Sequence, residues 1–229
     1  MTAPSPTAHP AVTISIPHEL NYIHKHLQLY IDICYINKMV FTVTRTDSVN
    51  YITINYMEKI IMHITRTINL YQTRGFVITD IFADNEFNMV DLNDAVSSAN
   101  LHICAAGEHV PKIERPIRII KERTRTICHS LPYKKLPRIM TKSIATTSNF
   151  WMNAFPTSGG ISGNYSPSNI IDNKSNPDCN KNRIPFGAYA LAYDKTNSTT
   201  KKIAIPCVAL NESNDSDGQY SMSLESGKS

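Results

Sequence analysis

Three acidic residues lie at positions where their carboxylates could act together on a metal ion. Asp32 lies inside an apolar, β-rich stretch, Asp84 ends another, and Glu114 opens a basic stretch, at intervals of 52 and 30 residues. A charge inside a buried strand is expensive unless it is paired or coordinates a cation. Three convergent carboxylates can hold two Mg²⁺ or Mn²⁺ ions, which activate an attacking oxygen and stabilise the leaving oxygen at phosphorus.

Cations follow Glu114 along residues 107–131. The isoleucines of this stretch recur at helical spacing, which predicts an amphipathic helix that Pro116 should kink or delay. A face of this kind suits a phosphate backbone, although an ordinary solvated helix with mixed charges would have the same pattern. The residues that we expect to bind nucleic acid are Lys112, Arg115, Arg118, Lys121 and Arg125.

Charge is unevenly spread along the 229 residues. The net charge is +4, but residues 111–142 hold ten Lys/Arg against Glu114 and Glu122, so this block carries +8 and the remainder −4. A basic block on a mildly acidic body predicts an anionic partner at one face.

Cysteine spacing and hydropathy argue against several protein classes. The five cysteines form no CxxC pair, which argues against a disulfide framework or a zinc ribbon. The N-terminus has no basic start followed by an apolar region, so we do not expect secretion. No apolar run approaches membrane-spanning length, so we expect no membrane association.

The elements that must position the carboxylates alternate between strands and helices. Asn37-Lys38 predicts a tight hairpin turn, and Gly75 predicts a helix C-cap. The order predicts an α/β mixed sheet backed by helices. Strands are expected at 27–37, 39–46, 50–56, 76–84 and 101–106, and helices at 57–75, 91–99, 107–131 and 141–155.

Composition also divides the chain. Residues 1–26 are expected to be a disordered or loosely packed lead, and 27–156 the core that carries the three carboxylates. Residues 157–184 are rich in Gly, Ser, Asn and Pro, which favours a linker. Residues 185–229 predict a small β region, cut short at Ser229, with strands at 187–195, 201–210 and 218–226.

Two motifs give this chain a resemblance to a known family. The run from Asp84 to Phe87 resembles the second-aspartate motif of integrases, and Glu114-Arg115 resembles the start of their glutamate helix. The strand around Asp32 suits the first aspartate, and residues 150–171 and 186–193 resemble the segments after the core. The chain resembles the integrase region of copia-type long-terminal-repeat retrotransposon polyproteins and, more distantly, retroviral integrases.

The resemblance implies a ribonuclease-H-like fold, a five-stranded mixed sheet with helices on both faces. It implies 3′ processing and strand transfer of DNA that depend on Mg²⁺ or Mn²⁺, with Asp32, Asp84 and Glu114 as catalytic residues and metal ligands. The implied partners are element ends and a target DNA duplex, together with a homo-oligomer as in integrases. The implied location is nuclear or cytoplasmic.

Two other functions stay open. The glycine usual after the Asp84-Asn85 pair is missing, the Asp84–Glu114 interval is short, and Pro116 follows Glu114 closely. A catalytically inactive remnant that at most binds nucleic acid would have these features. A ribonuclease-H-type hydrolase would use the same metals and a fourth carboxylate, for which Asp80 and Glu108 are candidates.

Overall fold

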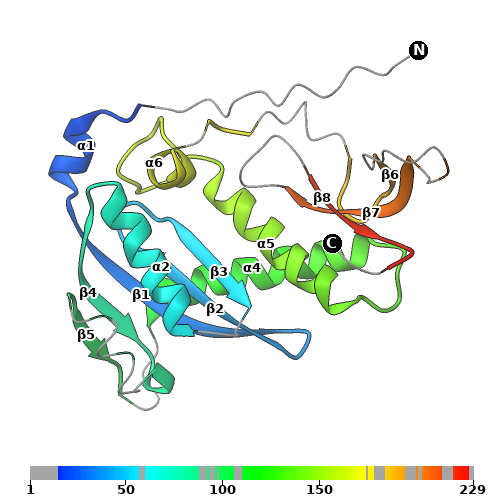
Figure 1. Cartoon of the computed structure of the whole chain (residues 1–229). Helices are drawn as coiled ribbons and strands as arrows, with labels where there is room; N and C mark the ends of the chain where they lie inside the picture. Colours follow the sequence, from blue (N-terminus) through cyan, green and yellow to red (C-terminus); the bar gives the residue numbers. More distant parts are fainter. Residues whose placement is uncertain are drawn as a thin grey trace.

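A five-stranded mixed sheet carries the core of the protein (Figure 1). The computed structural model describes residues 15–56, 60–87, 92, 96, 98–105, 110–173, 175–177, 184–193, 200, 203–212 and 219–226. The large sheet uses β1 (His26–Ile36), β2 (Met39–Thr46), β3 (Ile52–Tyr56), β4 (Val77–Ala83) and β5 (Asn100–Ile103). The helices are α1 (His18–Ile23), α2 (Ile60–Thr73), α4 (Pro111–Ser130), α5 (Arg138–Asn153) and α6 (Pro167–Asp172), with a 3₁₀ turn, η1 (Asn85–Phe87).

The strand order of this sheet is β3-β2-β1-β4-β5. β1, β2 and β3 pair antiparallel, whereas β4 joins β1 in parallel and β5 joins β4 in parallel. This arrangement confirms the predicted α/β class with a five-stranded mixed sheet. A second sheet, with β6 (Tyr189–Tyr193), β7 (Ala204–Glu212) and β8 (Gln219–Ser223) in the order β6-β7-β8, confirms the small C-terminal β region.

The β1–β2 hairpin closes with a two-residue turn. Asn37 and Lys38 both have positive φ, 48° and 62°, and Ile36 pairs with Met39 across them. Positive φ at both central residues is the geometry that matches the twist of antiparallel strands. The turn and both strands were predicted, because alternating apolar residues lie on each side of an Asn-Lys pair.

Side chains of β1 alternate between two helical layers. Leu27, Leu29 and Ile31 are fully buried in a core with residues of α2. Tyr30 and Cys34 belong to the core on the other side, with residues of α4 and α5. Figure 1 shows α2 against one face of the sheet and α4 with α5 against the other. Helices therefore cover both faces, as predicted.

The end of α5 covers part of the edge of β3. The side chain of Asn153 accepts a hydrogen bond from the Ile52 backbone N–H at 2.9 Å and donates to the Ile52 carbonyl oxygen at 2.7 Å. Asn149 donates to the same carbonyl oxygen at 3.0 Å. Side-chain amides thus take the place that a neighbouring strand would occupy at Ile52.

The segment that follows α5 also packs on the core. Ser166 begins α6 with a capping box, and Ile170 and Ile171 enter the core on the α2 side. The small sheet contacts α5 through a separate cluster that includes Met140 and Val208. Among the described residues, no helix is long and apolar enough to cross a membrane.

Candidate active site

The two candidate aspartates lie side by side at neighbouring strands. β1 and β4 run parallel, and Ile31 pairs with Ala83. Asp32 follows Ile31, and Asp84 follows Ala83 directly after the last residue of β4. Neighbouring strands are about 4.8 Å apart, so this register brings the two residues to adjacent positions at one place on the sheet. The parallel pairing therefore places two aspartates that are 52 residues apart in the sequence at neighbouring positions of the sheet.

Both aspartates belong to the α4 side of the sheet. Tyr30 and Phe82, the pair two residues earlier, stack with ring centroids 5.2 Å apart, and both contact the core on that side. Side chains alternate along a strand, so Asp32 shares a face with Tyr30, and the same alternation carried one residue past β4 places Asp84 with Phe82.

Glu114 reaches this region from the first turn of α4. Its neighbour Ile113 is fully buried in the core between α4 and the sheet, whereas Glu114 is exposed. Ile117 and Ile120 continue the buried stripe. The packing of this stripe fixes the rotation of α4 about its axis, and it therefore fixes the side of the helix on which Glu114 lies.

Pro116 lies inside α4 without delaying its start. The helix begins at Pro111, so of the two predicted effects of Pro116, a kink or a delayed start, the delay does not occur. A proline has no N–H, so the carbonyl of residue 112 loses its usual intrahelical donor. The Arg45 guanidinium from β2 donates to the Lys112 carbonyl oxygen and also to Asn50. A side chain from the sheet thus supplies the hydrogen bond that the proline removes.

Several negatively charged side chains lie near Asp32. Its partial burial raises the pKa of the Asp32 carboxyl, and the carboxylates of Asp84, Glu86 and Glu114 raise it further. A hydrogen bond from the Ile33 backbone N–H, at 2.6 Å, opposes the shift. The two other residues predicted from sequence, Asp84 and Glu114, are thus within electrostatic reach of Asp32, and so is Glu86.

The donor chemistry of these residues fits a divalent cation. Carboxylate oxygens are the ligands that Mg²⁺ and Mn²⁺ prefer, and a cation would relieve the repulsion that raises the pKa of Asp32. Within the part of the chain that the structure describes, no three His, Cys, Asp or Glu side chains form a group close enough to hold a metal.

Asp80 does not supply a fourth ligand. It precedes Asp84 by four residues on β4, which corresponds to about 13 Å along a strand. Its carboxylate is bound by His102 at 2.9 Å, by Thr79 at 2.8 Å and by Asn100 at 3.3 Å, and these hydrogen bonds lower its pKa. Glu108 lies outside the described residues.

The five cations expected to contact nucleic acid are all exposed on α4. Lys112 donates to the Tyr30 hydroxyl at 2.8 Å, so it also packs against the sheet. Burial raises the pKa of the Cys34 thiol to about 11, and that thiol also senses the charges of Lys121 and Asp32. Besides Lys112 and Lys121, the exposed cations expected to contact nucleic acid are Arg115, Arg118 and Arg125. The cationic side of α4 therefore adjoins the carboxylates.

Two contributions were missed in the sequence. Glu86 lies in the same short motif as Asp84, and this closeness was the available signal. Arg45 carried no such signal, because its partner Lys112 is 67 residues away. The function of Arg45 depends on the register that brings β2 under the start of α4.

The chain shares a similar arrangement of elements with solved structures, whereas its sequence matches no known family. No protein-family model and no curated protein matches the chain. The crystal structure of the catalytic core domain of BIV integrase is similar, with 14% sequence identity and a TM-score of 0.44. The match covers 65% of this chain and 93% of that chain.

Proposed function

We propose that this chain is an integrase-like polynucleotidyl transferase of the copia type, which carries out 3′ processing and strand transfer of DNA. The observation that supports the proposal is that Asp32 and Asp84 each follow a member of one residue pair on two parallel strands, and that the charges of Asp84 and of Glu114, in the first turn of α4, act on Asp32. Its proposed partners are element ends and a target duplex, its proposed location is nuclear or cytoplasmic, and assembly into a homo-oligomer is part of the proposal.

In this proposal each side chain has a stated task. Asp32, Asp84 and Glu114 would hold Mg²⁺ or Mn²⁺, which when bound would activate the attacking oxygen and stabilise the leaving oxygen at phosphorus. Arg118 and Lys121, one and two turns beyond Glu114, would hold the phosphate backbone in line with the carboxylates. Arg45 would keep the first turn of α4 in place.

Two alternatives each have a supporting observation. An inactive remnant that binds nucleic acid is favoured by the spacing of the described carboxylates, which do not form a ready metal-binding group. A ribonuclease-H-type hydrolase is favoured by Glu86, because it brings a fourth carboxylate within electrostatic reach of Asp32. The three functions predict different products from the same protein.

The test is an Mn²⁺-dependent joining assay on a duplex oligonucleotide with Glu114→Gln. We expect at least about a 100-fold loss of joining, the scale for removing one group that stabilises transition-state charge, while DNA binding persists. Glu122→Gln on the same helix is the matched control and should keep wild-type activity. Joining that survives in Glu114→Gln would remove this residue from the site.

A second readout does not depend on activity. Calorimetric titration with Mn²⁺ should show binding to the wild type and weaker binding to Asp32→Asn. Absence of product at every metal concentration, with DNA binding intact, would support the inactive remnant. Cleavage of the RNA strand in an RNA–DNA hybrid would support the hydrolase.

A further inference from the structure

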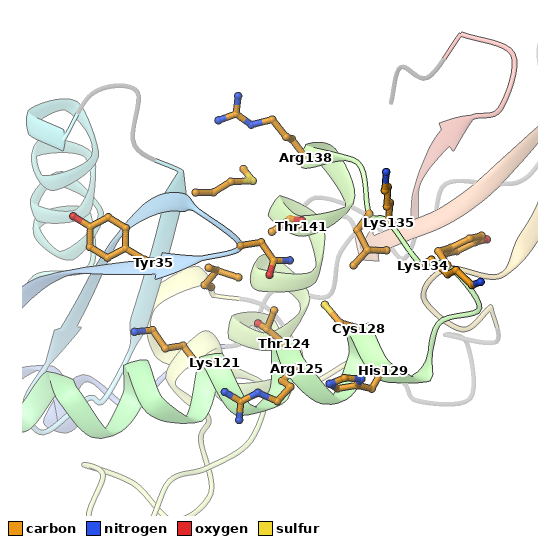
Figure 2. A pocket seen from close by; sticks show the side chains of 15 residues that line it. Tyr35, Lys121, Thr124, Arg125, Cys128, His129, Lys134, Lys135, Arg138 and Thr141 are labelled. Atoms are coloured by element: carbon orange, nitrogen blue, oxygen red, sulfur yellow. The ribbon is translucent and has the colours of Figure 1, made fainter.

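A basic groove lies at the end of α4 that is farther from Glu114 (Figure 2). It has a volume of about 820 Å³ and lies between the turn after β1, the second half of α4 and the connection from α4 to α5. Lys121 and Arg125 come from α4, whereas Lys134, Lys135 and Arg138 come from the connection and the start of α5. Cations thus line it from two directions.

No aspartate or glutamate is among the described residues that line this groove. Five positive side chains without a balancing carboxylate create a local field that attracts an anion and repels a cation. Arg138 donates to the Tyr56 hydroxyl at 2.9 Å, so its guanidinium is already oriented by β3. The groove therefore fits an extended polyanion better than a neutral ligand or a single small ion.

The groove and the candidate active site lie along the same helix and the same strand. Along α4, Lys121 is seven residues and Arg125 eleven residues beyond Glu114, which corresponds to about 10 Å and 16 Å at 1.5 Å per residue. Along β1, Ile36 and Asn37 line the groove and follow Asp32 by four and five residues. Two separate elements therefore lead from the carboxylates into the groove.

We infer that the groove binds one phosphate backbone of a DNA duplex whose reacting phosphate lies at the carboxylates. This inference rests on the proposed function and adds Lys134, Lys135 and Arg138 to the DNA-binding surface. At 3.4 Å per base pair, the distances along α4 correspond to about three to five base pairs. DNA that extends at least this far beyond the reacting phosphate reaches the groove, and shorter DNA does not.

The test measures the salt dependence of DNA binding by fluorescence anisotropy, in EDTA and in a Glu114→Gln background so that no DNA is processed. Each phosphate contact contributes about 0.9 to the slope of log K against log salt concentration, so Lys134→Gln/Lys135→Gln should lower the slope by about 1.8. Arg125→Gln, from the α4 side, should lower it by about 0.9. The exposed pair Lys25→Gln/Arg66→Gln is the control of equal charge, and its slope should stay at the wild-type value.

Duplex length provides the second arm. The slope difference between Lys134→Gln/Lys135→Gln and the control should appear with a long duplex and disappear with one that ends about two base pairs past the reacting phosphate. Equal slopes for the two double variants on long DNA would overturn the inference. An acidic peptide whose binding depends on Lys134 and Lys135 when DNA binding does not would overturn it in favour of a protein partner.

Cys128 gives an independent probe, because this half-buried thiol lines the groove. Saturating DNA should slow maleimide labelling of Cys128 several-fold, as measured by peptide mass spectrometry. An unchanged labelling rate would overturn the inference, whatever the joining assay shows. If the protein does not join DNA but DNA still protects Cys128, the proposed chemistry is wrong and the inferred binding of DNA in the groove stands.

Discussion

The pairing of Arg45 with the carbonyl opposite Pro116 leads to a quantitative prediction. Arg45→Met keeps the aliphatic stem and removes both hydrogen bonds, to the Lys112 carbonyl and to Asn50. Hydrogen bonds from a charged donor contribute about 1.5–3 kcal/mol, and the bond to Lys112 is exposed, so water can replace part of it. We expect the free energy of unfolding to fall by about 2 kcal/mol.

Pro116→Ala separates the two contributions. An alanine at this position restores the backbone N–H that donates to the Lys112 carbonyl, so Arg45 is needed there less. In the Pro116→Ala background we expect Arg45→Met to cost about 1 kcal/mol, because only the contact with Asn50 is then lost. The coupling of about 1 kcal/mol is above the 0.3–0.5 kcal/mol error of additivity.

The measurement is chemical denaturation of the four proteins in the cycle. Arg118→Met is the matched control, because it removes an exposed arginine from the same helix, and it should change stability by less than about 0.5 kcal/mol. Equal costs of Arg45→Met in the two backgrounds would refute the account of Pro116. Arg45→Met should lower joining activity by more than the loss of folded protein explains. The reason is that Glu114 lies in the same first turn of α4 as the Lys112 carbonyl that Arg45 binds.

Three further outcomes follow from the same geometry. The pKa of Asp32 is higher in the folded than in the unfolded chain, so ionisation of Asp32 lowers the stability of the fold as the pH rises. Asp32→Asn should therefore raise the melting temperature above that of the wild type at pH 7, but not below pH 3. Equal melting temperatures of the two proteins at pH 7 would contradict this. Cys34, fully buried and with a pKa of about 11, should resist iodoacetamide at pH 8 in the native protein, and labelling before unfolding would contradict its burial. Lys38→Gly should stabilise the hairpin by about 0.5–1 kcal/mol in thermal unfolding, since Lys38 has a φ of 62°, and a loss of stability would contradict the turn geometry.

Local patterns in the sequence predicted the strands and the turn of the large sheet. β2 begins and ends at the predicted residues, and Gly75 has the positive φ expected of a C-cap. These features depend on a few neighbouring residues, so alternation and turn chemistry are sufficient to identify them. The three strands of the small sheet were found for the same reason.

Long-range register was not available from the sequence. The pairing of Ile31 with Ala83 decides which residues flank Asp32, and no local pattern encodes it. The approach of Arg45 to Lys112 and the convergence of Lys134 with Lys121 depend on how separate layers pack. The carboxylates could therefore be proposed one at a time, whereas the groove could be found only in the folded chain.

The side-chain amides at Ile52 have a consequence for self-association. An uncovered edge strand can pair with the edge of another molecule and extend the sheet between chains. Asn149 and Asn153 already occupy the backbone groups of Ile52 through which such a strand would dock. A strand from another copy therefore cannot pair with β3 at Ile52 while these amides are in place, and Asn153→Leu, which frees the Ile52 N–H, is expected to make the protein more prone to aggregation.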